Sequence, residues 1–164
     1  MLQNKVFPQA AHCQCGDSHF TVKGAPILRF VCHCLICQAY TGKPYNDVTV
    51  LRAVDVDMPP PDKVSYRRYR RPPNISRGSC RACGKPVVET GGVWPLRLAF
   101  VPSDNYSNPD ALPPVAMHIF CHRRVAEITD AAPQYSGYLA SELQVVRSII
   151  AGLFRRRRAH DVQT

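Results

Sequence analysis

Eight cysteines are the residues of this chain best suited to chemistry, and seven of them occur in three close groups. The groups are Cys13-x-Cys15, Cys32-x-Cys34-x-x-Cys37 and Cys80-x-x-Cys83, while Cys121 stands alone. Close pairs place two thiolates on one tight turn, where both sulfurs can reach a tetrahedral metal ion at about 2.3 Å. This spacing is typical of zinc sites and not of ordinary buried thiols.

Disulfides are the alternative use of paired cysteines, and the expected compartment decides between the two. The N-terminal residues show no apolar segment followed by a small-residue cleavage site. No stretch approaches the roughly 20 apolar residues that a transmembrane helix needs. We therefore expect a cytoplasmic protein, and in a reducing cytosol clustered cysteines act as metal ligands or catalysts.

Glycine follows the last cysteine of two groups, at Gly16 and Gly84. Glycine at this position can adopt a positive φ, which lets backbone amides turn toward the thiolates. Two such turns facing each other would form a closed site with four thiolates. Its ligands would be Cys13, Cys15, Cys80 and Cys83.

The remaining group supplies three ligands from one loop, which are Cys32, Cys34 and Cys37. Three protein ligands with one exchangeable position are typical of a catalytic zinc, whereas four thiolates are typical of a structural one. The spacing leaves other partitions open. Cys121 or His33 could close the second site, or the triplet could share ligands with either pair. His33 is also the candidate catalytic residue, since it could orient substrate or carry a proton.

The net charge of +9 is concentrated in two arginine clusters. Arg67, Arg68, Arg70 and Arg71 alternate with tyrosines, a pattern found on surfaces that bind nucleic acid. Arg155 to Arg158 form a run near the C-terminus. The rest of the chain is only mildly basic, which suits an acidic small molecule as well as a polyanion. Nucleic acid is therefore a weaker expectation than a small acidic partner.

Short strands separated by turns are the main pattern, in keeping with 15 prolines and 9 glycines in 164 residues. We expect residues 1–10 to form a lead-in and residues 20–30 to form a hairpin. Further strands are expected over 45–51, 63–70, 87–90, 96–101, 116–121 and 125–128. The pattern predicts a single, mainly β domain of antiparallel sheets over residues 11–137.

Residues 138–164 read differently, as a basic amphipathic helix followed by a tail. Ser141 and Gln144 fit a capping box, and apolar residues then recur at helical spacing up to Phe154. We expect the helix to run from Ser141 to about Arg158 and to lie outside the β domain. Residues 141–158 could then bind an anionic membrane surface or mediate self-association.

Three segments together resemble a known family. They are Ala11-His12-Cys13-Gln14-Cys15-Gly16, Cys32-His33-Cys34-Leu35-Ile36-Cys37-Gln38-Ala39-Tyr40-Thr41-Gly42 and Arg77-Gly78-Ser79-Cys80-Arg81-Ala82-Cys83-Gly84. Their cysteine pattern resembles the glutathione-dependent formaldehyde-activating enzymes, a family that also includes centromere protein V. The resemblance extends over roughly 11–137.

The resemblance implies an Mss4-like fold with two zinc ions. It implies a structural zinc on the four paired cysteines and a second, open zinc on the triplet. It also implies a carbon–sulfur lyase that joins formaldehyde and glutathione to S-(hydroxymethyl)glutathione. Arg97 and Lys43 are the residues expected to meet glutathione's carboxylates. The competing hypothesis is a zinc-stabilised module that binds nucleic acid or chromatin without catalysis.

Overall fold

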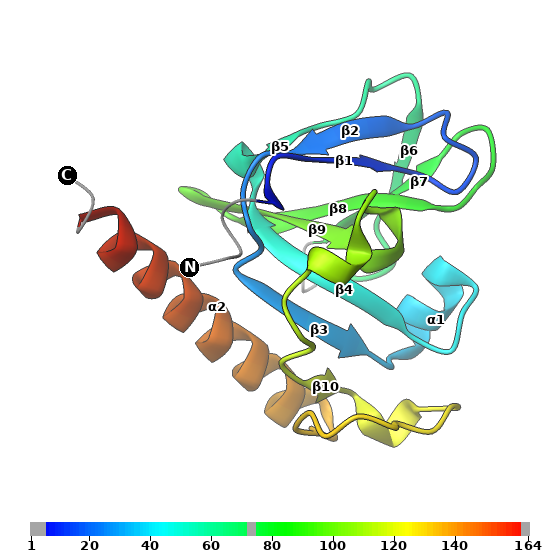
Figure 1. Ribbon diagram of the computed structural model, residues 1–164. Helices are drawn as coiled ribbons and strands as arrows, with labels where there is room; N and C mark the ends of the chain where they lie inside the picture. The colour runs from blue at the N-terminus through cyan, green and yellow to red at the C-terminus, as the bar shows by residue number, and fades with distance from the viewer. Residues whose placement is uncertain (1–5, 72–74, 162–164) are drawn as a thin grey trace.

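The computed structural model describes residues 6–71 and 75–161, without the side chains of 157–161. The described chain is mainly β (Figure 1). In chain order its strands are β1 (Gln9–His12), β2 (His19–Val22), β3 (Leu28–Cys32), β4 (Asn46–Arg52), β5 (Val56–Asp57), β6 (Val64–Arg67), β7 (Ser76–Cys80), β8 (Pro86–Val93), β9 (Leu96–Pro102) and β10 (His118–Ile119). The α-helices are α1 (Leu35–Thr41) and α2 (Tyr138–Asp161).

The strands form two sheets. The smaller has the order β1-β2-β5, and the larger has the order β10-β3-β4-β9-β8-β7-β6. Every strand pair is antiparallel except β10 with β3, which is parallel. In Figure 1 the smaller sheet lies above β8, β9 and β4 of the larger one. The expectation of a mainly β protein with a C-terminal helix is confirmed, whereas the Mss4-like fold stays a prediction.

The larger sheet is buried on both faces, as strand β4 illustrates. Thr49 and Leu51 belong to the side that packs against the smaller sheet, and Val48 and Val50 belong to the opposite side. Successive side chains of a strand point to opposite faces, so two-sided burial requires an unbroken apolar run. Strand β9 alternates in the same way over 98–101.

Helix α2 covers part of the second face, so the expectation that it lies outside the β domain is wrong. Ile149 is buried in the apolar cluster of that face, together with Phe30 and Phe100. At Gly152 the helix passes so close to Ile27 that a Cβ atom would lie 2.4 Å from its side chain. The sheet needs an apolar cover on this face, and the helix supplies it.

Helix α2 also begins earlier than expected. Gly137 has φ of +82°, and the helix starts at Tyr138, so Ser141 lies inside the helix and is not its N-cap. The Ser141 hydroxyl instead accepts a hydrogen bond of 2.9 Å from the amide of Phe120. In the described part of the chain, no helix is apolar and long enough to span a bilayer.

Two strand expectations are wrong. Residues 20–30 do not form a hairpin, because β2 pairs with β1 and β5 while β3 pairs with β4 and β10. The chain crosses from one sheet to the other at this point. Residues 125–128 form no strand. The lead-in expected over 1–10 already contains the start of β1, and residues 1–5 lie outside the described part.

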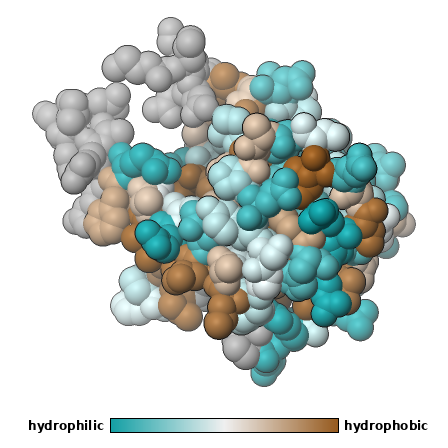
Figure 2. All heavy atoms as spheres, turned by 90° about the horizontal axis from the view of Figure 1, so that it is seen from below, coloured by the Kyte–Doolittle hydropathy of each residue, from teal (hydrophilic) through white to brown (hydrophobic). Residues whose placement is uncertain are grey.

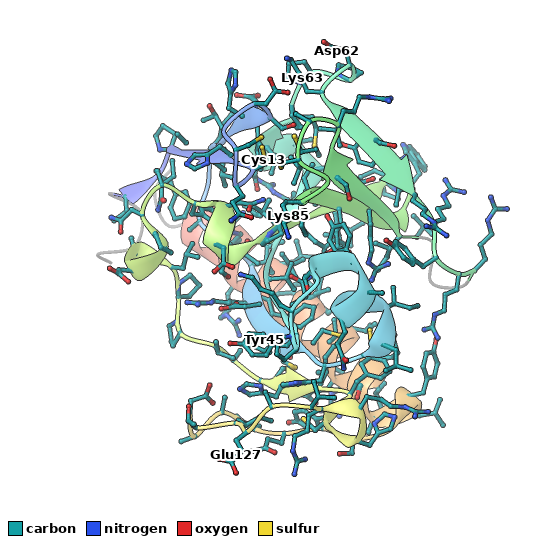
Figure 3. All side chains as sticks on the ribbon, turned by 90° about the vertical axis from the view of Figure 1, so that its right-hand side faces the viewer. Cys13, Tyr45, Asp62, Lys63, Lys85 and Glu127 are labelled. Carbon is teal, nitrogen blue, oxygen red and sulfur yellow. The ribbon has the colours of Figure 1, made fainter. Side chains whose placement is uncertain are left out.

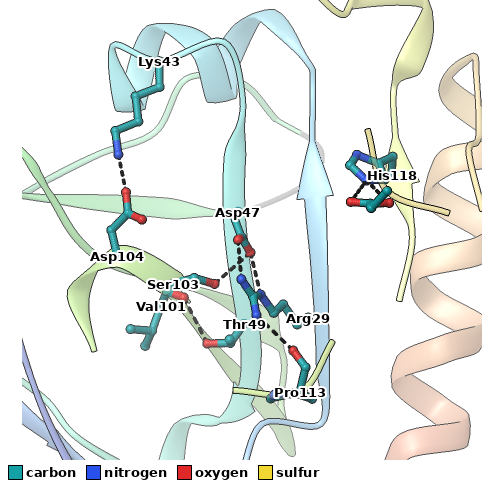
Figure 4. A network of polar contacts seen from close by, with 10 residues as sticks. Arg29, Lys43, Asp47, Thr49, Val101, Ser103, Asp104, Pro113 and His118 are labelled. Carbon is teal, nitrogen blue, oxygen red and sulfur yellow. Dashed lines mark hydrogen bonds and ion pairs between the residues drawn. The ribbon is translucent and has the colours of Figure 1, made fainter. Parts of the chain in front are cut away.

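A polar network joins β3, β4 and the turn after β9 (Figure 4). Asp47 accepts two hydrogen bonds from Arg29, at 2.9 and 2.7 Å, and one of 2.7 Å from Ser103. Bidentate arginine–carboxylate pairs fix geometry as well as charge. The network therefore holds the strand that leads into the cysteine triplet in register with its neighbour.

Candidate metal centres and an adjoining cavity

Four cysteines meet between the two sheets, at one end of the strands. Cys13 and Cys15 come from the turn after β1, and Cys80 and Cys83 come from the end of β7 and the turn after it. All four sulfurs lie within 4.8 Å of one another. Cys13 is labelled in Figure 3, close to Lys85 and Lys63, with other sulfur atoms beside it.

The two turns have the same construction, as expected from the glycines. Gly16 donates a hydrogen bond to the carbonyl of Cys13, and Gly84 donates one to the carbonyl of Cys80. Both glycines have positive φ, at +80° and +69°. The amide of Ser18 lies 3.3 Å from the sulfur of Cys13 and donates to it. Such turns present thiolates from two hairpins to one point.

The sulfur positions fit a tetrahedral ion. A metal–sulfur distance of about 2.3 Å in a regular tetrahedron gives sulfur–sulfur edges of about 3.8 Å. The edges Cys13–Cys15 and Cys15–Cys80 measure 3.4 and 3.8 Å. The described chain forms no disulfide, and all eight cysteines lie within it. This group could therefore hold a metal ion on four sulfurs.

The second group, Cys32, Cys34 and Cys37, lies on the opposite side of the larger sheet. Cys32 ends β3, Cys34 is the N-cap of α1, and Cys37 lies in its first turn. Their sulfurs also lie within 4.8 Å of one another, and Cys121 belongs to neither group. Hydrogen bonds from the thiols of Cys32 and Cys37 lower the pKa of the Cys34 thiol to about 2. The pKa values of Cys32 and Cys37 are raised instead, with the hydrogen bond to Cys34 among the causes in both cases, and the three sulfurs lie close enough together to hold a cation.

Charged side chains stand beside the triplet. The Arg77 guanidinium lies 4.0 Å from the sulfur of Cys37 and 3.0 Å from a carboxylate oxygen of Glu89. Asn46 donates a hydrogen bond of 2.9 Å to the other oxygen of Glu89. Glu89 is buried, and burial raises the pKa of its carboxyl from 4.5 to about 6. Arginine, carboxylate and amide therefore form a paired polar group next to the sulfurs.

A cavity of about 730 Å³ extends from the triplet between the larger sheet and α2. All three triplet cysteines line it, as do Asn46, Arg77 and Glu89, whereas none of the four cysteines between the sheets does. Most of the remaining wall is apolar. It includes Phe30, Val48, Leu98 and Phe100 from the sheet, and Val145 and Ile149 from the helix. Of the two cysteine groups, the triplet is the one that faces this cavity.

His33 points away from this cavity, although it lies between two cysteines of the triplet. Its ring is 1% exposed, lies 3.0 Å from a nitrogen of His118, and packs against Tyr45. The other nitrogen of His118 lies 3.0 Å from Asp130. Burial lowers the pKa of His33. His33 is not among the residues that line the cavity. A catalytic role for His33 stays a prediction.

The two residues expected to meet glutathione's carboxylates lie elsewhere. Lys43 forms an ion pair with Asp104 outside the cavity (Figure 4), and Arg97 is exposed at the β8–β9 hairpin. The cavity is instead bordered by Arg70, Arg77 and Arg123. The cationic groups near the cavity therefore differ from those expected.

The first arginine cluster is divided between the surface and the cavity. Arg67 and Arg68 are exposed, and Arg67 lies over the ring of Tyr69. Arg70 lies over the ring of Tyr138 on α2 and 3.7 Å from the carboxylate of Glu142. Part of this cluster therefore connects the β domain to α2, and whether its exposed part meets nucleic acid stays a prediction.

The sequence analysis did not identify Arg77 and Glu89 as residues of the site, although one signal in the sequence could have indicated them. The turn at Cys80-x-x-Cys83 closes a hairpin between β7 and β8, in which Arg77 lies opposite Glu89. A hairpin centred on Cys83 places positions 77 and 89 at equal distances from its centre. Opposite charges at such positions indicate a cross-strand pair, but β7 was not expected as a strand.

The architecture defines a class of protein, a mainly β domain in which two cysteine groups could hold metal ions and one adjoins a cavity. Residues 8–123, more than half of the chain, match the model of the glutathione-dependent formaldehyde-activating enzyme family. The chain therefore belongs to this family, and the resemblance seen in the sequence is confirmed. The match includes all seven clustered cysteines and ends before Asp130 and α2. No curated protein matches the chain.

Proposed function

We propose that the chain binds two zinc ions and is an enzyme that forms or breaks carbon–sulfur bonds. In this proposal Cys13, Cys15, Cys80 and Cys83 hold a structural zinc, and Cys32, Cys34 and Cys37 hold a second zinc with an open position. The reaction joins a small thiol such as glutathione to formaldehyde, as the family's name suggests. The observation that carries the proposal is that the three-cysteine group alone faces the cavity.

The donor sets suit these two roles. Four thiolates complete a tetrahedral zinc, whereas three leave a position for an exchangeable ligand. When bound to the triplet, zinc would stabilise the thiolate form of a substrate thiol, which is mostly protonated at neutral pH. The triplet's contribution is to hold that ion at the polar end of the cavity, beside Arg77 and Glu89.

The reaction requires one proton to move. The thiol sulfur bonds to the carbonyl carbon, the C=O π bond breaks, and the thiol proton ends on the oxygen. We assign the transient holding of this proton to Glu89, because its carboxyl lines the cavity and its pKa of about 6 lies near neutrality. His33 is less suited, since its ring does not line the cavity.

The test is to measure zinc content and adduct formation from glutathione and formaldehyde in Cys34→Ser, with Cys121→Ser as the matched control. Both positions carry thiols, but Cys121 belongs to neither group. We expect Cys34→Ser to lose one zinc and about a hundredfold or more of the rate, and Cys121→Ser to keep both. Equal rates in the two variants would contradict the proposal.

A spectroscopic test examines the open position directly. Cobalt replaces zinc in thiolate sites and gives an absorption that depends on its ligands. Addition of glutathione to the cobalt protein should change this absorption if a thiol takes the fourth position. An unchanged spectrum at saturating glutathione, together with no adduct formation, would favour the alternative of a zinc-stabilised binding module.

A further inference from the structure

The walls of the cavity differ in character between its two ends. Its buried charged groups are Arg77 and Glu89 at the cysteine end, which are paired with each other, while Arg70, Arg123 and Glu142 also line it but are exposed or partly exposed. Away from that end the walls are aromatic and aliphatic, supplied by the sheet and by α2. Phe30, Phe100 and Ile149 are each less than 10% exposed. A ligand that fills the cavity must therefore have a polar reacting end and an apolar remainder.

Formaldehyde fills little of this cavity, and the charged groups of glutathione do not match its inner, apolar walls. Formaldehyde has one carbon and leaves nearly all of a 730 Å³ cavity unused. Glutathione carries two carboxylates and an ammonium group, and burial of unpaired charges against apolar walls is strongly unfavourable. The charge of the buried Arg77 is already balanced by Glu89, so a second carboxylate buried beside it would add an unbalanced negative charge.

We propose that the cavity accepts an aldehyde bearing an aliphatic or aromatic group of about six to ten carbon atoms. This inference rests on the proposed function and names the substrate class of the same site. The thiol sulfur bonds to the aldehyde carbon, the π electrons pass to the oxygen, and the oxygen takes the thiol's proton. The product is a hemithioacetal, and no oxidant or reductant is needed.

The border of the cavity suits the thiol half of such an adduct. Arg123 and His122 are exposed there, and the side chain of Arg70 is 40% exposed. Carboxylates of a thiol such as glutathione can meet the Arg123 guanidinium there without losing contact with water, while Arg70 is shared with Glu142 and His122 accepts a hydrogen bond from the amide of Gly137. The apolar group of the aldehyde then lies inward, along Val48, Leu98 and Val145. The polar thiol half of the adduct then contacts the charged border, and the apolar aldehyde half contacts the apolar interior.

The first test compares octanal with formaldehyde, with glutathione as the thiol and the uncatalysed rates subtracted. Each buried methylene group adds about fourfold to affinity, so kcat/KM for octanal should exceed that for formaldehyde by about a hundredfold or more. Equal or lower kcat/KM for octanal would overturn the inference and leave the proposed function standing. Absence of catalysis with either aldehyde would count against the proposed function instead.

The second test locates the apolar group and does not depend on catalysis. Val145→Trp fills part of the cavity from α2, at a half-buried position where a larger side chain can be accommodated. Leu139→Trp is the matched control, because Leu139 lies on the same helix, is 80% exposed and is not part of the wall. Calorimetric titration with 1-octanol, which is unreactive, should show binding that only Val145→Trp weakens, by about tenfold or more. Lack of octanol binding, or equal weakening in both variants, would overturn the inference.

Discussion

The two cysteine groups occupy opposite sides of one sheet and differ in what surrounds them. The four-cysteine group lies between the sheets, on hairpins whose cysteines are more than sixty positions apart. The triplet comes from a single loop and faces a cavity that helix α2 helps to enclose. A metal ion at the first site would join distant parts of the chain, whereas one at the second would add little to chain connectivity. The number of ligands and their sequence separation thus support the proposed division into a stabilising site and a reacting site.

The strongest way to test this difference is to remove one ligand from each group. Structural zinc contributes folding free energy on the order of 10 kcal/mol in small domains. We therefore expect Cys80→Ser to unfold or aggregate, while Cys34→Ser stays folded and holds one zinc. Circular dichroism with metal analysis distinguishes these outcomes. A folded Cys80→Ser protein that retained both metals would contradict the assignment of roles.

The second prediction concerns the apolar face that bears the triplet. Ile149 is 7% exposed against the sheet, whereas its neighbour Ile150 is 47% exposed. Ile149→Ala should lower the free energy of unfolding by about 2 to 4 kcal/mol, because it leaves a space in a packed core. Ile150→Ala should change it by less than about 1 kcal/mol. Urea unfolding of the two variants measures both values.

Equal effects of the two alanine substitutions would show that α2 does not pack on the sheet in solution. The same variants sharpen the comparison between the metal sites. Ile149 belongs to the cluster on the triplet's side and not to the one between the sheets. We expect Ile149→Ala to leave the zinc of the four-cysteine group in place, as judged by metal analysis after dialysis.

The third prediction uses the pH dependence of Glu89, which lies beside the triplet. Burial raises the pKa of its carboxyl to about 6 in the folded protein, above the ordinary value of 4.5. The folded state therefore favours the protonated form, and this stabilisation is complete below pH 4.5 and is lost as the pH rises through 6. A shift of about 1.5 pKa units corresponds to about 2 kcal/mol.

Glu89→Gln stays neutral at every pH, so its stability lacks this dependence. Relative to the variant, the wild type should gain about 2 kcal/mol in free energy of unfolding between pH 7 and pH 4. Glu127→Gln is the control, because Glu127 is exposed at the far edge of the molecule (Figure 3). A difference between wild type and Glu89→Gln that does not change with pH would contradict the assigned environment.

The sequence predicted the cysteine groups well, because ligand spacing within a turn is a local property. Cys13 with Cys15, and Cys80 with Cys83, lie on turns whose glycines adopt the expected positive φ. The facing of these two turns is a long-range contact, which the count of ligands favoured but did not fix, since two pairs and a triplet can also be divided in other ways. Chemistry therefore supplied a constraint that strand patterns alone could not.

The cavity could not be predicted from the sequence, for a physical reason. The apolar stripe of α2 indicated that the helix needs a partner, but periodicity does not say which surface that partner is. The side chain of Ile149 packs against the larger sheet, whereas Leu139, Leu143 and Phe154 remain exposed on another side of the helix. Apolar side chains gather on the face of the molecule shown in Figure 2. Whether residues 141–158 also bind a membrane or a second subunit stays a prediction.

The smallest expected effect concerns an ion pair between α2 and the residue that precedes the smaller sheet. Arg156 on α2 forms an ion pair of 2.8 Å with Asp55, which immediately precedes β5 of the smaller sheet. This pair connects the helix that covers the triplet's face to the sheet that carries Cys13. Asp55 also pairs with Arg52, at 2.9 Å. Removal of Arg156 therefore leaves the carboxylate with a partner.

Arg156→Ala should lower the free energy of unfolding by about 0.5 to 1 kcal/mol, because the pair is only partly buried and Arg52 remains beside Asp55. Arg155→Ala is the matched control, since Arg155 is exposed on the same turn, and it should change stability by less than about 0.5 kcal/mol. Urea unfolding of the zinc-loaded variants measures the difference. A loss above about 3 kcal/mol for Arg156→Ala would mean that the helix and the smaller sheet stabilise one another strongly. The two cysteine groups could then not be altered independently, because a change at the triplet's face would also weaken the four-cysteine site.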